Sequence, residues 1–148
     1  MKIGIANDHW GVMLKQSIML YLLENGYEVI NYGTDTDDNV NYTDYAIKLG
    51  EAINKGDVEF GIAICGTGVG ISIAMNKIKN MRCAKVNNLE EVKQSRMHIN
   101  CNVMAFASST NLELAKEMVL AFINTEFVSE KRYLHRIEKL KEMDNVKV

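Results

Sequence analysis

Residues 58–72 limit the possible folds more than any other part of the chain, because they join a buried strand directly to a glycine-rich turn. Their sequence is VEFGIAICGTGVGIS, and the apolar run over residues 60–64 is typical of a buried strand. Glycine then occupies every second position from 66 to 70, which permits a tight turn that directs successive N–H groups at an anion. A thiol, Cys65, and a hydroxyl, Thr67, lie in the same turn. This stretch predicts a strand, a turn and a helix with a candidate site between them.

Short apolar runs alternate with segments of helical periodicity along the whole chain. Strands that alternate with helices form a parallel sheet with right-handed crossovers, which carry helices to both faces. The sequence therefore predicts an α/β fold. We expect strands at residues 2–6, 27–31, 60–64, 82–86 and 102–107. We expect helices at residues 11–25, 42–55, 71–79, 89–97, 111–124 and 126–141.

Polar residues follow three of the predicted strands, at residues 7–9, 65–70 and 87–88. In a parallel sheet of this kind, ligands bind outside the carboxyl ends of the strands. The three polar segments can therefore converge on one edge of the sheet, which makes that edge the expected place of a site.

Composition excludes several classes of protein. A chain of 148 residues is about the length of one domain, and a net charge of −2 favours neither nucleic acid nor a membrane as a partner. The sequence has no apolar run of 18 residues and no signal segment at its start, so we expect a cytoplasmic protein. Its three cysteines lack CxxC spacing, which argues against a disulfide framework and a zinc site.

The glycine turn allows two interpretations. Its GxGxG spacing differs from the phosphate loop and from the dinucleotide-binding fingerprint, so it is either another kind of anion cradle or a connection without a ligand. Cys65 is either a small buried apolar residue or a nucleophile or base. Its expected place beside a helix N-terminus favours the second interpretation, because such places stabilise a thiolate.

The other candidate residues also have two interpretations each. Asp8 and His9 form either a carboxylate–imidazole pair for acid–base chemistry or a polar turn. His98 either belongs to the same site or ends a helix in solvent. Arg132 and Arg136 are four residues apart and share a helix face, where they form either a phosphate clamp or part of a solvated, charged helix.

Four segments carry a family resemblance: KIGIANDHWG, YEVINYGT, NYTDYA and GIAICGTGVGISIAMNKI. Later matches are Arg82 with Ala84, His98 with Asn102 and Val103, and NTEF leading into Arg132 and Arg136. In these segments, and nearly from end to end, the chain resembles the family of type B ribose-5-phosphate isomerases and galactose-6-phosphate isomerase subunits.

The resemblance implies a Rossmann-like three-layer α/β/α sandwich with a five-stranded parallel sheet, formed by one domain over residues 1–148. It also implies a homodimer or tetramer with the active site between subunits, and a C-terminal helix of about residues 129–143 that packs on the partner. The implied activity is an aldose–ketose isomerisation of ribose 5-phosphate and ribulose 5-phosphate through a cis-enediolate, with neither a metal nor an organic cofactor.

The same resemblance implies a role for each candidate residue. Cys65 is the base that moves a proton between C1 and C2, and Thr67 assists at the substrate hydroxyls. Asp8 and His98 open the sugar ring. The implied binding residues are the backbone N–H groups of Gly66, Gly68, Val69 and Gly70 for the oxyanion, Tyr42 for the sugar, and His9, Arg132 and Arg136 for the phosphate, with the arginines from the neighbouring subunit.

Five positions depart from the usual pattern of the family. Ile99 stands where an asparagine follows the histidine, Ser109 where an arginine helps to hold phosphate, and Asn87–Asn88 where a His–Asp pair is usual. Trp10 stands where small residues are common. These departures leave the substrate open: the alternatives are a hexose-6-phosphate isomerase for allose or galactose 6-phosphate, or a partner-dependent subunit of such an enzyme. A nucleotide-binding module is disfavoured by the spacing of the glycine turn.

Overall fold

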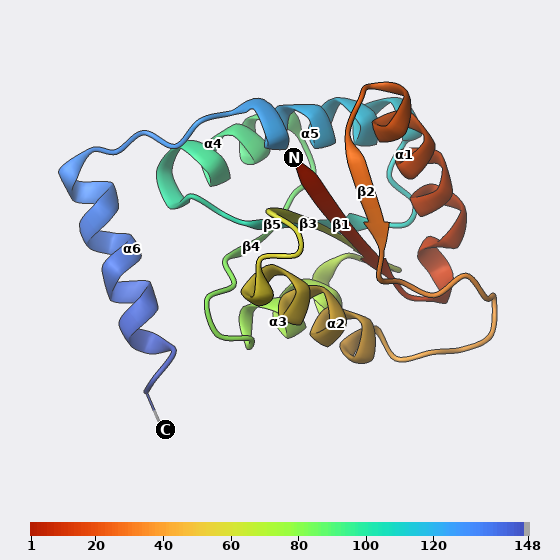
Figure 1. Ribbon diagram of the computed structural model, residues 1–148, viewed down its shortest axis with the longest axis horizontal. Helices are drawn as coiled ribbons and strands as arrows, with labels where there is room; N and C mark the ends of the chain where they lie inside the picture. The colour runs from red at the N-terminus through yellow and green to blue at the C-terminus, as the bar shows by residue number, and fades with distance from the viewer. Residues whose placement is uncertain (147–148) are drawn as a thin grey trace.

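Five parallel strands form one sheet in the computed structural model, which describes residues 1–146 (Figure 1). The strands are β1 (Lys2–Asn7), β2 (Glu28–Asn31), β3 (Phe60–Cys65), β4 (Cys83–Lys85) and β5 (Val103–Ala107). Their order across the sheet is β2-β1-β3-β5-β4, and every pair is parallel. The predicted five-stranded parallel sheet is therefore confirmed.

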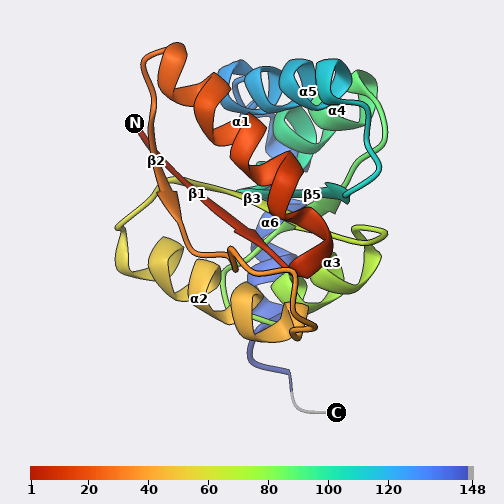
Figure 2. The same ribbon diagram turned by 90° about the vertical axis from the view of Figure 1, so that its right-hand side faces the viewer.

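Helices cover both faces of the sheet and give the molecule three layers (Figures 1 and 2). On one face lie α1 (Val12–Glu24), α4 (Leu89–Ile99) and α5 (Leu112–Asn124), and on the other lie α2 (Tyr42–Lys55) and α3 (Val69–Asn76). The last helix is α6 (Lys131–Met143). The predicted α/β/α sandwich is confirmed. Within residues 1–146, no helix is both long and apolar enough to cross a membrane.

The two faces of the sheet carry side chains of different size. Toward α1 and α5 the central strands present large buried residues such as Ile64 and Phe106. Toward α2 they present small ones, and Leu49 of α2 fills the space above the glycines. A Cβ at Gly4 would lie 2.7 Å from a Leu49 methyl carbon, and a Cβ at Gly61 would lie 3.0 Å from the other. These glycines let α2 pack directly on the sheet.

The helices that follow β1 and β3 begin at other residues than the sequence predicts. The first is preceded by a 3-10 turn, His9–Gly11, because the Asp8 carboxylate accepts the Trp10 N–H at 3.0 Å and ends the strand with a cap. α3 begins at Val69, two residues early, because the glycine turn is completed at position 68. Both differences tighten the connections at the carboxyl ends of the strands.

α6 stands apart from the three layers, on the β4 side of the sheet (Figure 1). The sequence predicts its start at 126, but residues 125–130 are not helical, and the Val128 N–H donates to the Met97 carbonyl at 3.0 Å. The ring of Tyr133 stacks on His98 with centroids 4.7 Å apart. α6 is thus fixed through α4, and its packing on a partner subunit stays a prediction.

Candidate active site

The turn between β3 and α3 closes on the thiol of Cys65. Cys65 is 3% exposed, and the Gly68 N–H donates a hydrogen bond of 3.2 Å to its Sγ. Gly68 has a φ of +79°, and a Cβ there would lie 2.7 Å from the carbonyl carbon of Phe106. Both facts require glycine at this position. The buried thiol of Cys65 thus faces a backbone donor of the glycine turn.

The backbone donors of this turn have different partners. The Val69 N–H donates to Thr67 Oγ1 at 3.2 Å, which leaves the hydroxyl proton of Thr67 free to donate elsewhere. Of the donors in the turn, one is thus committed to sulfur and one to a hydroxyl, while the N–H groups of Gly66, Thr67 and Gly70 have no backbone acceptor within residues 1–146.

The turn that follows β1 lies beside the glycine turn. The Asp8 N–H donates to the Ile64 carbonyl at 3.2 Å, and a Cβ at Gly11 would lie 2.8 Å from Ile64 Cγ2. The ring of Trp10 reaches the glycine turn, where a Cβ at Gly66 would lie 3.5 Å from its Cδ1. Because β2 and β3 lie on opposite sides of β1, a crevice for ligands is expected at this edge.

A backbone donor fixes the ring of His9. The Val40 N–H donates to His9 Nδ1 at 3.2 Å. Nδ1 therefore carries a lone pair, and the neutral ring carries its proton on Nε2, where it can be donated to a phosphate oxygen. The loop that contains Val40 is held by the buried ammonium of Lys15, which donates to the Thr34 carbonyl and the Asp35 carboxylate. The hydrogen bond from Lys15 lowers the pKa of the Asp35 carboxyl.

Tyr42 adds an aromatic wall to this edge. It is the first residue of α2, and a Cβ at Gly70 would lie 2.7 Å from its Cζ, so the ring rests directly on the start of α3. The predicted site residues that the structure brings to this edge of the sheet are Asp8, His9, Tyr42, Cys65, Gly66, Thr67, Gly68, Val69 and Gly70.

The other predicted site residues lie elsewhere in the same chain. His98 is next to last in α4, which runs back to the amino ends of the strands, so it lies at the opposite end of the sheet from Cys65. Arg132 and Arg136 are exposed on α6, and Arg132 pairs with Glu130 at 3.0 Å. One chain alone does not assemble the complete predicted site.

The residues that depart from the family pattern lie at the surface. Ile99 is 41% exposed, and Ser109 is also exposed. Asn88 caps α4 by accepting the Glu91 N–H at 2.9 Å, while the Glu91 carboxylate accepts the Asn87 N–H at 2.8 Å. Residues 87–88 therefore form a helix cap. They share an edge with Cys65, but β5 separates their strand from β3, so the expected convergence is limited to residues 7–9 and 65–70.

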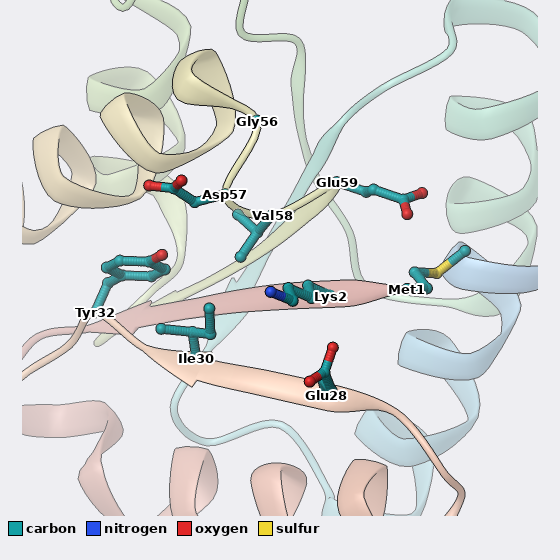
Figure 3. A pocket seen from close by; sticks show the side chains of 9 residues that line it. All are labelled: Met1, Lys2, Glu28, Ile30, Tyr32, Gly56, Asp57, Val58 and Glu59. Atoms are coloured by element: carbon teal, nitrogen blue, oxygen red, sulfur yellow. The ribbon is translucent and has the colours of Figure 1, made fainter.

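A cleft of about 610 Å³ opens at the amino ends of β1, β2 and β3, away from Cys65 (Figure 3). Carboxylates of Glu28, Asp57 and Glu59 surround it. Burial raises the pKa of the Tyr32 hydroxyl beside it, and the charge of Asp57 adds to this effect. Within residues 1–146, no group of three or more His, Cys, Asp or Glu side chains could hold a metal ion. This cleft is not part of the site described above.

A second cleft, of about 520 Å³, lies between α6 and the β4 side of the sheet. We call it the α6 cleft; its lining includes Met81, Cys83, Cys101, Leu140 and Met143. Burial raises the pKa of Cys101 to about 11, and it raises that of Cys83 further. Both side chains therefore remain protonated thiols at neutral pH.

Two contacts of the site were not predicted from the sequence. Lys15 had a signal, because it is a charged residue on the buried side of an apolar helix, next to Leu14 and near Ile18. Val40 had none, because it acts through its backbone N–H, whose direction depends on the whole loop. Sequence patterns can therefore reveal a buried charged side chain such as Lys15, but they miss a residue such as Val40 that acts through its backbone.

An open parallel sheet with polar side chains and a glycine-rich turn at its carboxyl edge is typical of an α/β protein that binds a small molecule. The chain belongs to the Ribose/Galactose Isomerase family, whose sequence profile matches residues 3–140. It is therefore an enzyme of the aldose–ketose isomerase class.

Similar proteins match this chain over nearly its full length. Ribose-5-phosphate isomerase B of Escherichia coli (strain K12) is 40% identical over 140 residues, which cover 94% of this chain and 93% of that protein. D-erythrulose-4-phosphate isomerase of Pectobacterium atrosepticum is 35% identical over 129 residues, which cover 86% and 85%. The structure of Clostridium thermocellum ribose-5-phosphate isomerase B is 40% identical with a TM-score of 0.94 and covers 97% of both chains. The family predicted from the sequence is confirmed.

Proposed function

We propose that this chain interconverts ribose 5-phosphate and ribulose 5-phosphate through a cis-enediolate, with Cys65 as the base. The observation that carries the proposal is the Gly68 N–H bonded to Cys65 Sγ, in a turn whose Gly66, Thr67 and Gly70 N–H groups have no backbone acceptor within residues 1–146. A carbon acid beside a carbonyl needs a base near carbon and donors near oxygen, and this turn supplies both. The likeness to ribose-5-phosphate isomerases B of Escherichia coli and Clostridium thermocellum supports the choice of substrate.

In the proposed reaction, Asp8 and His98 exchange protons with the ring oxygen and the C1 hydroxyl to open the sugar. The Cys65 thiolate then takes the proton from C2, and the electron pair moves to the C1 oxygen. The N–H groups of Gly66 and Thr67 stabilise the resulting oxyanion. The thiol returns its proton to C1 while the Thr67 hydroxyl relays a proton from O2 to O1, which yields the ketose without net loss of atoms.

The proposal also requires a second copy of the chain. His9 binds the phosphate through Nε2, and Arg132 and Arg136 of the partner subunit add charge-assisted hydrogen bonds. His98 likewise comes from the partner, since each chain holds it at the far end of its own sheet from Cys65. We therefore propose a cytoplasmic homodimer, alone or paired into a tetramer, in which α6 packs on the partner.

The direct test is a parallel assay of the full-length chain with four substrates: ribose 5-phosphate, allose 6-phosphate, galactose 6-phosphate and D-erythrulose 4-phosphate. The last is included because a relative is named for it. We expect the highest kcat/KM with ribose 5-phosphate. A higher kcat/KM with a hexose or tetrose phosphate would refute the proposed substrate, and inactivity with all four would refute the reaction or indicate a missing partner chain.

Mixing two inactive variants tests the shared site. Cys65→Ala and His98→Ala are each expected to be inactive alone. If each site combines residues of two chains, random co-assembly restores one intact site in half of the dimers, or about a quarter of wild-type activity. A co-expressed mixture that stays inactive, with dimers present by sedimentation, would contradict the shared site.

A further inference from the structure

Trp10 is the only tryptophan of the sequence and is 67% exposed, although it lies inside the site. Its backbone is held firmly, since its N–H donates to Asp8 Oδ1 at 3.0 Å within the 3-10 turn. Gly11, the next residue, packs against Ile64 of β3. Because the backbone on both sides of this ring is held, the fold determines where the ring of Trp10 is attached.

The ring of Trp10 lies between the two halves of the proposed site. On one side it contacts the glycine turn, where the place of a Cβ on Gly66 is 3.5 Å from Cδ1 and 3.8 Å from Cγ. On the other side its centroid is 5.6 Å from that of His9, with the ring planes tilted by 41°. The carbon chain of a substrate that joins the phosphate at His9 to the reacting carbons at Cys65 must pass this ring.

Fixed ends make such a site sensitive to substrate length. The phosphate end is set by His9, which Val40 orients, and the reacting end is set by Cys65, which Gly68 orients. Because the separation of these ends is fixed, the carbon chain of a sugar phosphate with one more CHOH unit has to bend out of the direct path between them. The glycine turn lies on that side of the Trp10 ring, since a Cβ at Gly66 would be 3.5 Å from Cδ1, and it limits how far the ring can move in that direction.

We propose that Trp10 forms one wall of the sugar site and selects pentose phosphates over hexose phosphates. This inference rests on the function proposed above, and it adds the residue that determines which chain length is accepted. One additional carbon unit in a fitted pocket changes kcat/KM by about 10- to 200-fold, which is the size of selection that we assign to this wall.

The test compares Trp10→Ala with Trp10→Phe in the full-length protein. The measured quantity is the ratio of kcat/KM for ribose 5-phosphate to kcat/KM for allose 6-phosphate. We expect Trp10→Ala to lower this ratio at least about tenfold and Trp10→Phe to lower it less. Met13→Ala is the matched control, because Met13 is 81% exposed one helical turn further on and plays no part in the proposed site.

A ratio that stays within about twofold of wild type in Trp10→Ala would disprove the wall. So would a lowered ratio that accompanies dissociation of the oligomer, measured by sedimentation, because Trp10 would then act as a subunit contact.

The fluorescence of Trp10 separates this inference from the proposed function. In Cys65→Ala, which is expected to turn substrate over at least about 100-fold more slowly, we expect ribose 5-phosphate to change the emission at a concentration at least about tenfold below that of allose 6-phosphate. Equal affinities would contradict the wall even if the enzyme isomerises ribose 5-phosphate. Selective binding by a wild-type protein without isomerase activity would support the wall and contradict the proposed function alone.

Discussion

The turn after β3 and the α6 cleft each enclose a cysteine that is 3% exposed, but the two thiols have different neighbours. At the turn, the Gly68 N–H donates to Cys65 Sγ. In the α6 cleft, burial raises the pKa of Cys101 to about 11, although the charges of Arg82 and Arg96 lower it in part. At equal burial the two thiols thus have different surroundings: Cys65 accepts a backbone N–H in the turn of the proposed site, whereas Cys101 lines a cleft in which burial raises its pKa.

Removing each sulfur in turn tests whether the two thiols differ in function. We expect Cys65→Ala to lower kcat by about 10²- to 10⁴-fold, because a base that transfers the substrate proton contributes that much. We expect Cys101→Ala to retain wild-type kcat and to lose about 1 kcal/mol of stability. Steady-state kinetics and urea unfolding measure the two effects. Loss of kcat in Cys101→Ala without unfolding would show that the regions are not separate.

Substitutions at two glycines test whether activity depends on the backbone geometry of the turn as well as on the sulfur of Cys65. Gly68 and Gly26 both have positive φ, but a Cβ at Gly68 meets the backbone of Phe106 while nothing lies within 4 Å at Gly26. We expect Gly68→Ala to lower kcat/KM by about 100-fold, the cost of a displaced oxyanion donor. Gly26→Ala carries only the left-handed strain of about 1 kcal/mol and keeps its activity. Equal kinetics of the two variants would show that the turn tolerates distortion.

The arginines of α6 test whether that region takes part in binding. If they hold phosphate across the subunit boundary, Arg136→Ala raises KM for ribose 5-phosphate about 10- to 100-fold and changes kcat less, because charge-assisted hydrogen bonds have that strength. Lys139→Ala is the control, since Lys139 lies on the same helix and pairs with Glu142 at 3.5 Å. A KM in Arg136→Ala equal to that of Lys139→Ala would give α6 a purely structural role.

The strands, the helices and the glycine turn around Cys65 could be predicted because they depend on local sequence patterns. Apolar runs and helical periodicity identified all five strands, and the glycines at alternate positions identified the turn around Cys65. The place of β5 between β3 and β4 could not be predicted, because strand order depends on how helices pack on the sheet. The bond from Val40 to His9 could not be predicted either, because the direction of this one N–H depends on the whole loop of residues 32–41.

The smallest effect concerns the pH dependence of stability in the α6 cleft. Cys101 has an ordinary thiol pKa of 9.0 in the unfolded chain and about 11 in the folded protein. Its contribution to stability is therefore complete below pH 9 and is lost as the pH rises through about 11, because only the unfolded chain ionises in that window. Two pH units correspond to at most about 2–3 kcal/mol.

Urea unfolding between pH 7 and 11 measures this loss. We expect the stability of Cys101→Ala to fall less steeply above pH 9 than that of the wild type. The control is Val103→Ala, which removes buried volume two residues away but no ionisable group, and so keeps the wild-type slope. Identical slopes for Cys101→Ala and Val103→Ala would mean that Cys101 ionises as readily in the folded protein as in the unfolded chain. Cys65 and Cys101 would then differ in their place in the fold, and the raised pKa of Cys101 would no longer distinguish them.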